Sequence, residues 1–151
     1  MIYTRQTGLD SYKIRPDARQ FENWESFVVG RVGLCTTIEY ALEWGQEAIY
    51  ARIQMLAGEL RARLMDITGV QVRDLGFETC GIESFTKTGV DADKIKEQLQ
   101  VDAINVSTSS KSSTLLDMQE MGIASIVRAR VHYYNSEEEL ERFTDAISDI
   151  G

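Results

Sequence analysis

Cysteine, histidine and proline are scarce in this chain, and each scarcity excludes a class of protein. The 151 residues include two cysteines, one histidine and one proline. Cys35 and Cys80 lack the short spacing of a metal-binding pair, which favours a reduced, cytoplasmic protein over a disulfide scaffold. His132 has no histidine or cysteine at ligand spacing. The sequence therefore predicts no metal site.

Long apolar runs and excess positive charge are also missing. The apolar runs are a few residues long, whereas a membrane-spanning helix needs about 20. The first twenty residues lack the apolar core of a signal peptide. A net charge of −8 speaks against a nucleic-acid surface, which needs a basic footprint. Glycine-rich phosphate loops and nucleophile elbows are likewise absent from the sequence. We therefore expect a compact cytoplasmic protein without a membrane or nucleic-acid partner.

The chain divides into an N-terminal segment and one larger domain. Residues 1–22 are polar and without a clear period, which predicts an irregular segment. The domain, residues 23–151, begins with a helical part, residues 23–68, in which Gly45 separates two long helices. Residues 69–151 follow as a ββαββα run.

The second long helix carries the cleanest periodicity in the chain, and this stripe predicts a buried core helix. The apolar residues at three- and four-residue steps are Ile49, Ile53, Leu56, Leu60, Leu64 and Ile67.

The elements after this helix are also predicted from short stretches of sequence. Predicted strands cover residues 70–73, 81–86, 103–108 and 125–134, and the Ser/Thr-rich run 107–114 is expected to be a loop. Asp91 is a predicted helix N-cap, and Ser136 with Glu139 form a capping box.

These elements predict an α+β fold. A small, mostly antiparallel sheet would be covered on one face by helices and preceded by the two long helices. The last strand, 125–134, alternates in character. One face carries Val127, Ala129, Val131 and Tyr133, and the other carries Arg128, Arg130 and His132. A strand with an apolar and a cationic face is either a solvated edge or the wall of an anion site.

Arg128 is the candidate binding residue of that strand. It lies between Val127 and Ala129, where a long charged side chain gains little from β-propensity. A guanidinium in this position pairs well with a carboxylate, which can belong to the protein or to a ligand. The residues alone place an internal salt bridge slightly ahead of a ligand contact.

Three segments resemble one family, in the right order and over nearly all of the chain from about residue 12. The run VRARVHYYNSEEELERF, residues 127–143, resembles the C-terminal signature of class V aminotransferase-like, pyridoxal-phosphate-dependent enzymes. These transferases include cysteine desulfurases and isopenicillin-N-epimerase-like proteins. The run RPDAR at 15–19, followed by Phe21-Glu22, resembles an earlier part of the family. So does Ile104 to Ser107 with the polar loop that ends at Asp117-Met118.

The resemblance implies a role for this segment inside a larger enzyme. It would be the C-terminal small domain of a homodimeric, fold-type I enzyme whose N-terminal large domain holds pyridoxal phosphate. In the family the arginine at the position of Arg128 binds the α-carboxylate of the amino-acid substrate. Arg130 and His132 would line the same cleft. No cofactor is expected on this segment alone.

Two departures from the family pattern limit the expectation. The Schiff-base lysine has no counterpart among Lys13, Lys87, Lys94, Lys96 and Lys111, and 151 residues are too few for the whole enzyme. The loop 109–114, where desulfurases carry their nucleophilic cysteine, contains none. We therefore expect a fragment that is inactive alone. The alternatives are a free-standing α+β module that binds a small anion or a protein partner without catalysis, and a degenerate regulatory subunit.

Overall fold

The structure is a computed structural model that describes residues 4–21 and 26–151. The chain forms two compact units, Met1–Trp44 and Gly45–Gly151. The predicted boundary between residues 22 and 23, like Glu22 of the family resemblance, lies outside the described residues.

The first unit contains a hairpin and a long helix. Strands β1 (Thr4–Gly8) and β2 (Ser11–Ile14) pair antiparallel, and the short helix η1 (Ala18–Phe21) follows. An irregular segment was the wrong expectation for residues 4–14. The hairpin depends on pairing between the two strands and on a hydrogen bond of 3.0 Å between the hydroxyls of Thr7 and Ser11. Neither interaction gives the sequence an alternating apolar pattern from which strands are predicted. Helix α1 (Val28–Trp44) has no buried residue.

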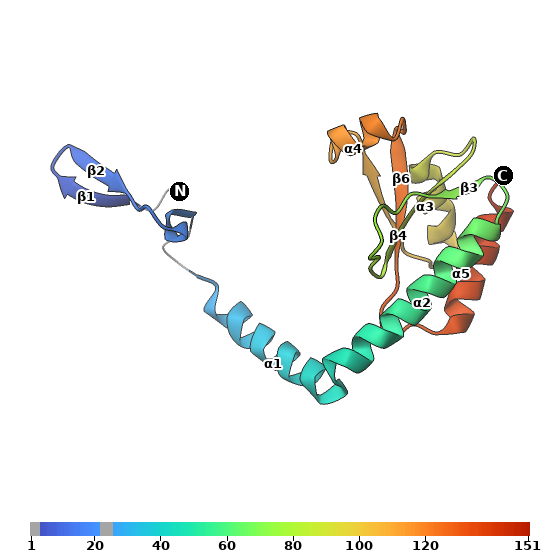
Figure 1. Cartoon of the computed structure of the whole chain (residues 1–151), viewed down its shortest axis with the longest axis horizontal. Helices are drawn as coiled ribbons and strands as arrows, with labels where there is room; N and C mark the ends of the chain where they lie inside the picture. Colours follow the sequence, from blue (N-terminus) through green and yellow to red (C-terminus); the bar gives the residue numbers. More distant parts are fainter. Residues whose placement is uncertain (1–3, 22–25) are drawn as a thin grey trace. The chain divides into compact units, whose positions relative to one another are not determined.

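The second unit holds one four-stranded sheet and most of the helices (Figure 1). Its elements are α2 (Gln46–Asp66), β3 (Val70–Val72), β4 (Ile82–Lys87), α3 (Ala92–Val101), β5 (Ser107–Ser110), α4 (Leu115–Glu120), β6 (Ser125–Arg130) and α5 (Glu137–Asp149). The strand order is β3-β4-β6-β5, and every pair is antiparallel. The predicted α+β class is confirmed, and Gly45, with a φ of 85°, separates α1 from α2 as expected.

The core lies between one face of this sheet and the helices α2, α3 and α5. Leu56, Leu60 and Leu64 of α2 are buried, as the stripe predicts. They belong to the same cluster as Phe85, at the middle of β4, and Phe143 of α5. The two phenyl rings meet edge to face with centroids 6.2 Å apart, a preferred geometry for aromatic pairs.

Three predicted boundaries are wrong, and each error has a local cause. The strand expected at 103–108 begins only at Ser107, because Ala103 has a φ of 56° and the Ile104 amide donates to the carbonyl of Leu99 to close α3. The polar run is therefore partly strand β5 and partly the turn before α4, a helix that the sequence reading did not predict. Strand β6 ends at Arg130 instead of residue 134, because a turn follows.

No helix in residues 4–21 and 26–151 combines the length and the apolar character needed to cross a membrane.

Candidate functional site

The face of the sheet away from the α2–α3–α5 core carries Arg128, on β6, one of the two central strands. Arg128 pairs with Ser84 of β4 on one side and with Ser107 of β5 on the other. Residues paired across an antiparallel sheet project from the same face. Val127 and Ala129, which alternate with Arg128, are buried in the core. Arg128, a half-buried residue, therefore projects from the face away from the core, between two hydroxyl-bearing residues.

Two further arginines lie on this face. Arg130 pairs with Ile82 two residues along β6 from Arg128. Arg73 follows β3, and its amide donates to the carbonyl of Ser84 at 2.6 Å, which continues the row of paired residues. Its Nε donates to the hydroxyl of Thr86, two residues along β4, at 3.1 Å. We call the set Arg73, Ser84, Thr86, Ser107, Arg128 and Arg130 the arginine face.

The arginine face has no internal counter-charge within the described ranges 4–21 and 26–151. None of the described ion pairs involves Arg73, Arg128 or Arg130. Glu83, the acidic residue of β4, is 0% exposed on the opposite, core side of the sheet. The salt-bridge alternative for Arg128 thus finds no partner in this part of the chain.

A buried ionic cluster lies on the core side of the same strands. Arg61 of α2 places its Nε 2.8 Å from Asp74 Oδ2 and one Nη 3.4 Å from Glu83 Oε1. That Nη also donates to the Cys80 carbonyl at 2.5 Å. Burial raises the pKa of Glu83 to about 7, since the attraction of Arg61 does not offset the loss of water and Asp74 adds repulsion. The cluster connects α2 to the β3–β4 loop.

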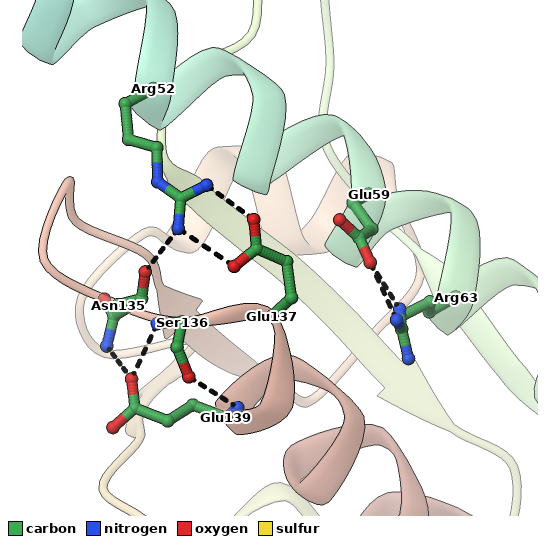
Figure 2. Close-up of polar contacts among 7 residues, drawn as sticks. All are labelled: Arg52, Glu59, Arg63, Asn135, Ser136, Glu137 and Glu139. Carbon is green, nitrogen blue, oxygen red and sulfur yellow. Dashed lines mark hydrogen bonds and ion pairs between the residues drawn. The ribbon is translucent and has the colours of Figure 1, made fainter.

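The turn after β6 is held from two sides, as Figure 2 shows. Arg52 of α2 donates to both carboxylate oxygens of Glu137, at 2.6 and 3.1 Å, and to the Asn135 carbonyl at 2.9 Å. The predicted capping box is confirmed, because Ser136 Oγ accepts from the Glu139 amide and Glu139 accepts from the Ser136 amide. The Arg52 hydrogen bonds lower the pKa of Glu137 to about 2. These contacts fix the chain that leaves the arginine face.

His132 is not on the arginine face. It lies beyond the end of β6, where its amide donates to Asn135 Oδ1 at 2.8 Å and its exposed ring stacks on Tyr134 at 4.6 Å. His132 and Arg130 line a pocket next to α5 in which Arg128 has no part. The structure thus brings together Arg128 and Arg130 and separates His132 from Arg128.

Sequence reasoning missed Arg73, Ser84 and Ser107. Their only signal is strand register, because a residue joins the face when it pairs with Arg128 or continues that row. The predicted strands 70–73 and 81–86 were nearly right, but a sequence does not state which residues of two strands stand opposite each other.

Comparison with protein families identifies one match over most of the chain. The family described as aminotransferase class-V matches residues 3–143. A curated relative, a probable cysteine desulfurase from Xylella fastidiosa, is 24% identical over 146 residues, which are 97% of this chain and 35% of the relative. The cysteine desulfurase of Synechococcus elongatus is 27% identical over 136 residues, 90% of this chain and 22% of its own.

Solved structures give the same result for the fold. The apo cysteine desulfurase from Thermococcus onnurineus is 26% identical with a TM-score of 0.79, over 97% of this chain and 37% of that one. A C-DES mutant with glycine covalently linked to its PLP cofactor is 21% identical with a TM-score of 0.70, over 88% of this chain and 32% of that one. The chain spans only about a third of the length of the first of its curated relatives.

Proposed function

Since the chain belongs to the aminotransferase class-V family, we propose that it is the C-terminal small domain, with its preceding helices, of a pyridoxal-phosphate-dependent enzyme that acts on an amino acid. The observation that carries the proposal is the position of Arg128. It stands on β6, on the face of the sheet away from the core, between Ser84 and Ser107, without an ion pair to the described part of the chain. We assign it the α-carboxylate of the substrate. Charge-assisted hydrogen bonds of this kind contribute about 1.5–3 kcal/mol each.

The cofactor would be held by another part of the enzyme. A solved relative carries PLP, which acts as an electron sink for amino-acid substrates when bound. The residues of this chain do not fit the covalent attachment of PLP at the arginine face, since none of the positions that form this face is a lysine. Lys87 of β4 instead donates to the carbonyls of Ile147 and Ser148 at the end of α5. The share of this segment is therefore to bind and orient the substrate.

Helix α1 supports an intact enzyme with further protein around it. Its exposed large apolar side chains are Val28, Val29, Val32, Leu34, Ile38, Tyr40, Leu42 and Trp44. An apolar surface of this extent is typical of a contact with other protein. We propose that a cofactor-binding large domain and a second copy of a cytoplasmic homodimer supply that contact.

Desulfurase chemistry through a loop cysteine is not part of the proposal. The turn between β5 and α4 contains no cysteine. Cys35 lies in α1, and Cys80 is exposed in the β3–β4 loop with its carbonyl bonded to Arg61. The proposed class is amino-acid chemistry that needs no thiol from this segment.

Replacing Arg128 with alanine in the intact enzyme tests the assignment. The loss of one or two charge-assisted bonds should weaken amino-acid binding by about 10- to 150-fold, from ~1.5–3 kcal/mol, while the cofactor absorbance of the unliganded enzyme stays unchanged. Titration of the cofactor spectrum with the amino acid measures this affinity. Arg63→Ala is the matched control, because it removes a surface arginine of α2 that pairs with Glu59 at 2.7 Å (Figure 2). An R128A affinity equal to that of the control contradicts the proposed role.

A second experiment tests the division of labour on the 151-residue chain alone. The chain is incubated with pyridoxal phosphate, reduced with borohydride and analysed by mass spectrometry. We expect no stoichiometric labelling of one lysine. A single labelled lysine with its own absorbance band would show that this segment holds the cofactor itself, which contradicts the proposal.

A further inference from the structure

We propose that Arg73 is a second anion-binding residue of the arginine face, and that Arg73 with Arg128 selects an amino acid whose side chain carries a second carboxylate. The inference rests on the proposed function, because it takes Arg128 as the residue that binds the α-carboxylate. It adds a substrate class and a residue that determines it.

The first support is the position of Arg73 in the sheet. Its amide donates to the Ser84 carbonyl, and Ser84 in turn pairs with Arg128. Arg73 and Arg128 thus belong to one row and lie two strands apart, which corresponds to about 10 Å between their Cα atoms. Ser84 occupies the position between them. Arginines whose Cα atoms are about 10 Å apart on one face of a sheet can turn their side chains toward the two ends of one small dianion.

The second support is the state of the Arg73 side chain. It is half-buried, and its Nε is held by Thr86 Oγ1 at 3.1 Å. A guanidinium has five N–H donors, so most of them remain available. The adjacent acid, Asp74, does not neutralise it, because Asp74 accepts from Arg61 at 2.8 Å and from the Ser84 amide at 2.9 Å. Arg73 is therefore oriented by a neutral partner and keeps its charge for a ligand.

The third support is the contrast between this face and the rest of the molecule. The chain has a net charge of −8, yet the arginine face combines three arginines with three hydroxyl residues and no acidic one. Planar guanidinium groups bind carboxylates through two parallel hydrogen bonds. A monocarboxylate needs one such group, whereas a dicarboxylic amino acid engages two.

The test is a ligand titration of the 15N-labelled 151-residue chain, followed by NMR at the arginine Nε–H signals. The probes are butyrate, a monocarboxylate, and glutarate, a dicarboxylate, at equal ionic strength. We expect glutarate to bind about tenfold more tightly than butyrate, the factor that one further bond of ~1.4 kcal/mol supplies. Arg73→Gln should reduce glutarate binding to the butyrate level. Arg128→Gln should weaken both.

Two further variants make the outcome specific. Arg73→Lys keeps the charge without the planar fork and should retain only part of the glutarate preference. Arg63→Gln removes an equal charge from the surface of α2 and should change nothing. Equal affinities for the two probes, or an R73Q glutarate affinity equal to wild type, overturn the inference and leave the role of Arg128 intact. Butyrate binding that R128Q does not weaken overturns the proposed function as well, and no binding of either probe overturns the inference.

Discussion

The buried carboxyl group of Glu83 should make the second unit less stable as the pH rises toward neutrality. Burial raises its pKa from 4.5 to about 7, so the folded state keeps a proton that the unfolded chain loses. Between these two values the unfolded state binds fewer protons, and the free energy of unfolding therefore falls with increasing pH. Each pKa unit corresponds to ~1.4 kcal/mol, which gives a loss of about 3 kcal/mol across this window.

The substitution Glu83→Gln isolates this effect. The amide has nearly the same shape, needs no proton and can still contact Arg61, which lies 3.4 Å from Glu83 Oε1. We expect the E83Q free energy of unfolding at pH 8 to equal or exceed that of wild type, and its decline between pH 4.5 and 7 to disappear. Urea denaturation at a series of pH values, followed by circular dichroism, measures both quantities.

Glu59→Gln is the matched control, because Glu59 is a half-buried glutamate of α2 that pairs with Arg63 on the surface (Figure 2). E59Q should keep the wild-type pH dependence. The reasoning fails if E83Q loses about 3–5 kcal/mol at pH 8, the cost of breaking a buried ion pair that is stabilising overall. In that case the charged pair of Arg61 and Glu83, and not the buried proton, supports the fold.

Three other predictions concern the packing and the last helix. Gly81→Ala should destabilise the second unit by about 1–3 kcal/mol in urea denaturation, because the added Cβ would lie 2.9 Å from the Val131 carbonyl and 2.7 Å from Ile53 Cγ2; wild-type stability would show that the strands can separate at no cost. Ser136→Ala removes the N-cap of α5 and should cost about 1 kcal/mol, with Ser136→Thr as the control that retains the hydroxyl. Below pH 4.5 the sign of the pH dependence should reverse: the pKa of Glu137 is lowered to about 2 in the folded state, so its contribution is lost as the pH falls from 4.5 to 2. A urea midpoint that keeps rising below pH 4 would contradict this.

Local signals predicted much of the fold, and pairing accounts for most of what was missed. The stripe of α2 and the capping box of α5 lie within single helices, where spacing along the chain determines which side chains are neighbours. The hairpin β1–β2 and the position of β5 depend instead on which segments pair, and Ser107–Ser110 has no apolar residue to mark a buried face. For that reason the serine- and threonine-rich run 107–114 was predicted to be a loop.

In the candidate site, too, features within one strand were predicted and features that depend on strand pairing were not. Alternation along β6 correctly put Val127 in the core and Arg128 on the other face, because both residues belong to one strand. Arg73 joins the face only through the register of β3 and β4, which spacing does not encode. His132 was assigned to the face by extending the strand through a turn whose geometry depends on Asn135. Arg61 follows Leu60 of the apolar stripe in the sequence. Its burial was not predicted, because it depends on ion pairs with Asp74 and Glu83, which come later in the chain.

β6, one of the two central strands of the sheet, is also the last of its four strands to be synthesised. Among the described residues β5 pairs only with β6, so its backbone has no partner in this sheet until residue 130 has left the ribosome, whereas β3 and β4 can already form a hairpin. Until β6 is available, the unpaired backbone groups of β5 can form hydrogen bonds with other nascent chains. The serine and threonine side chains of β5 offer such chains no apolar surface, which reduces the risk of aggregation during translation.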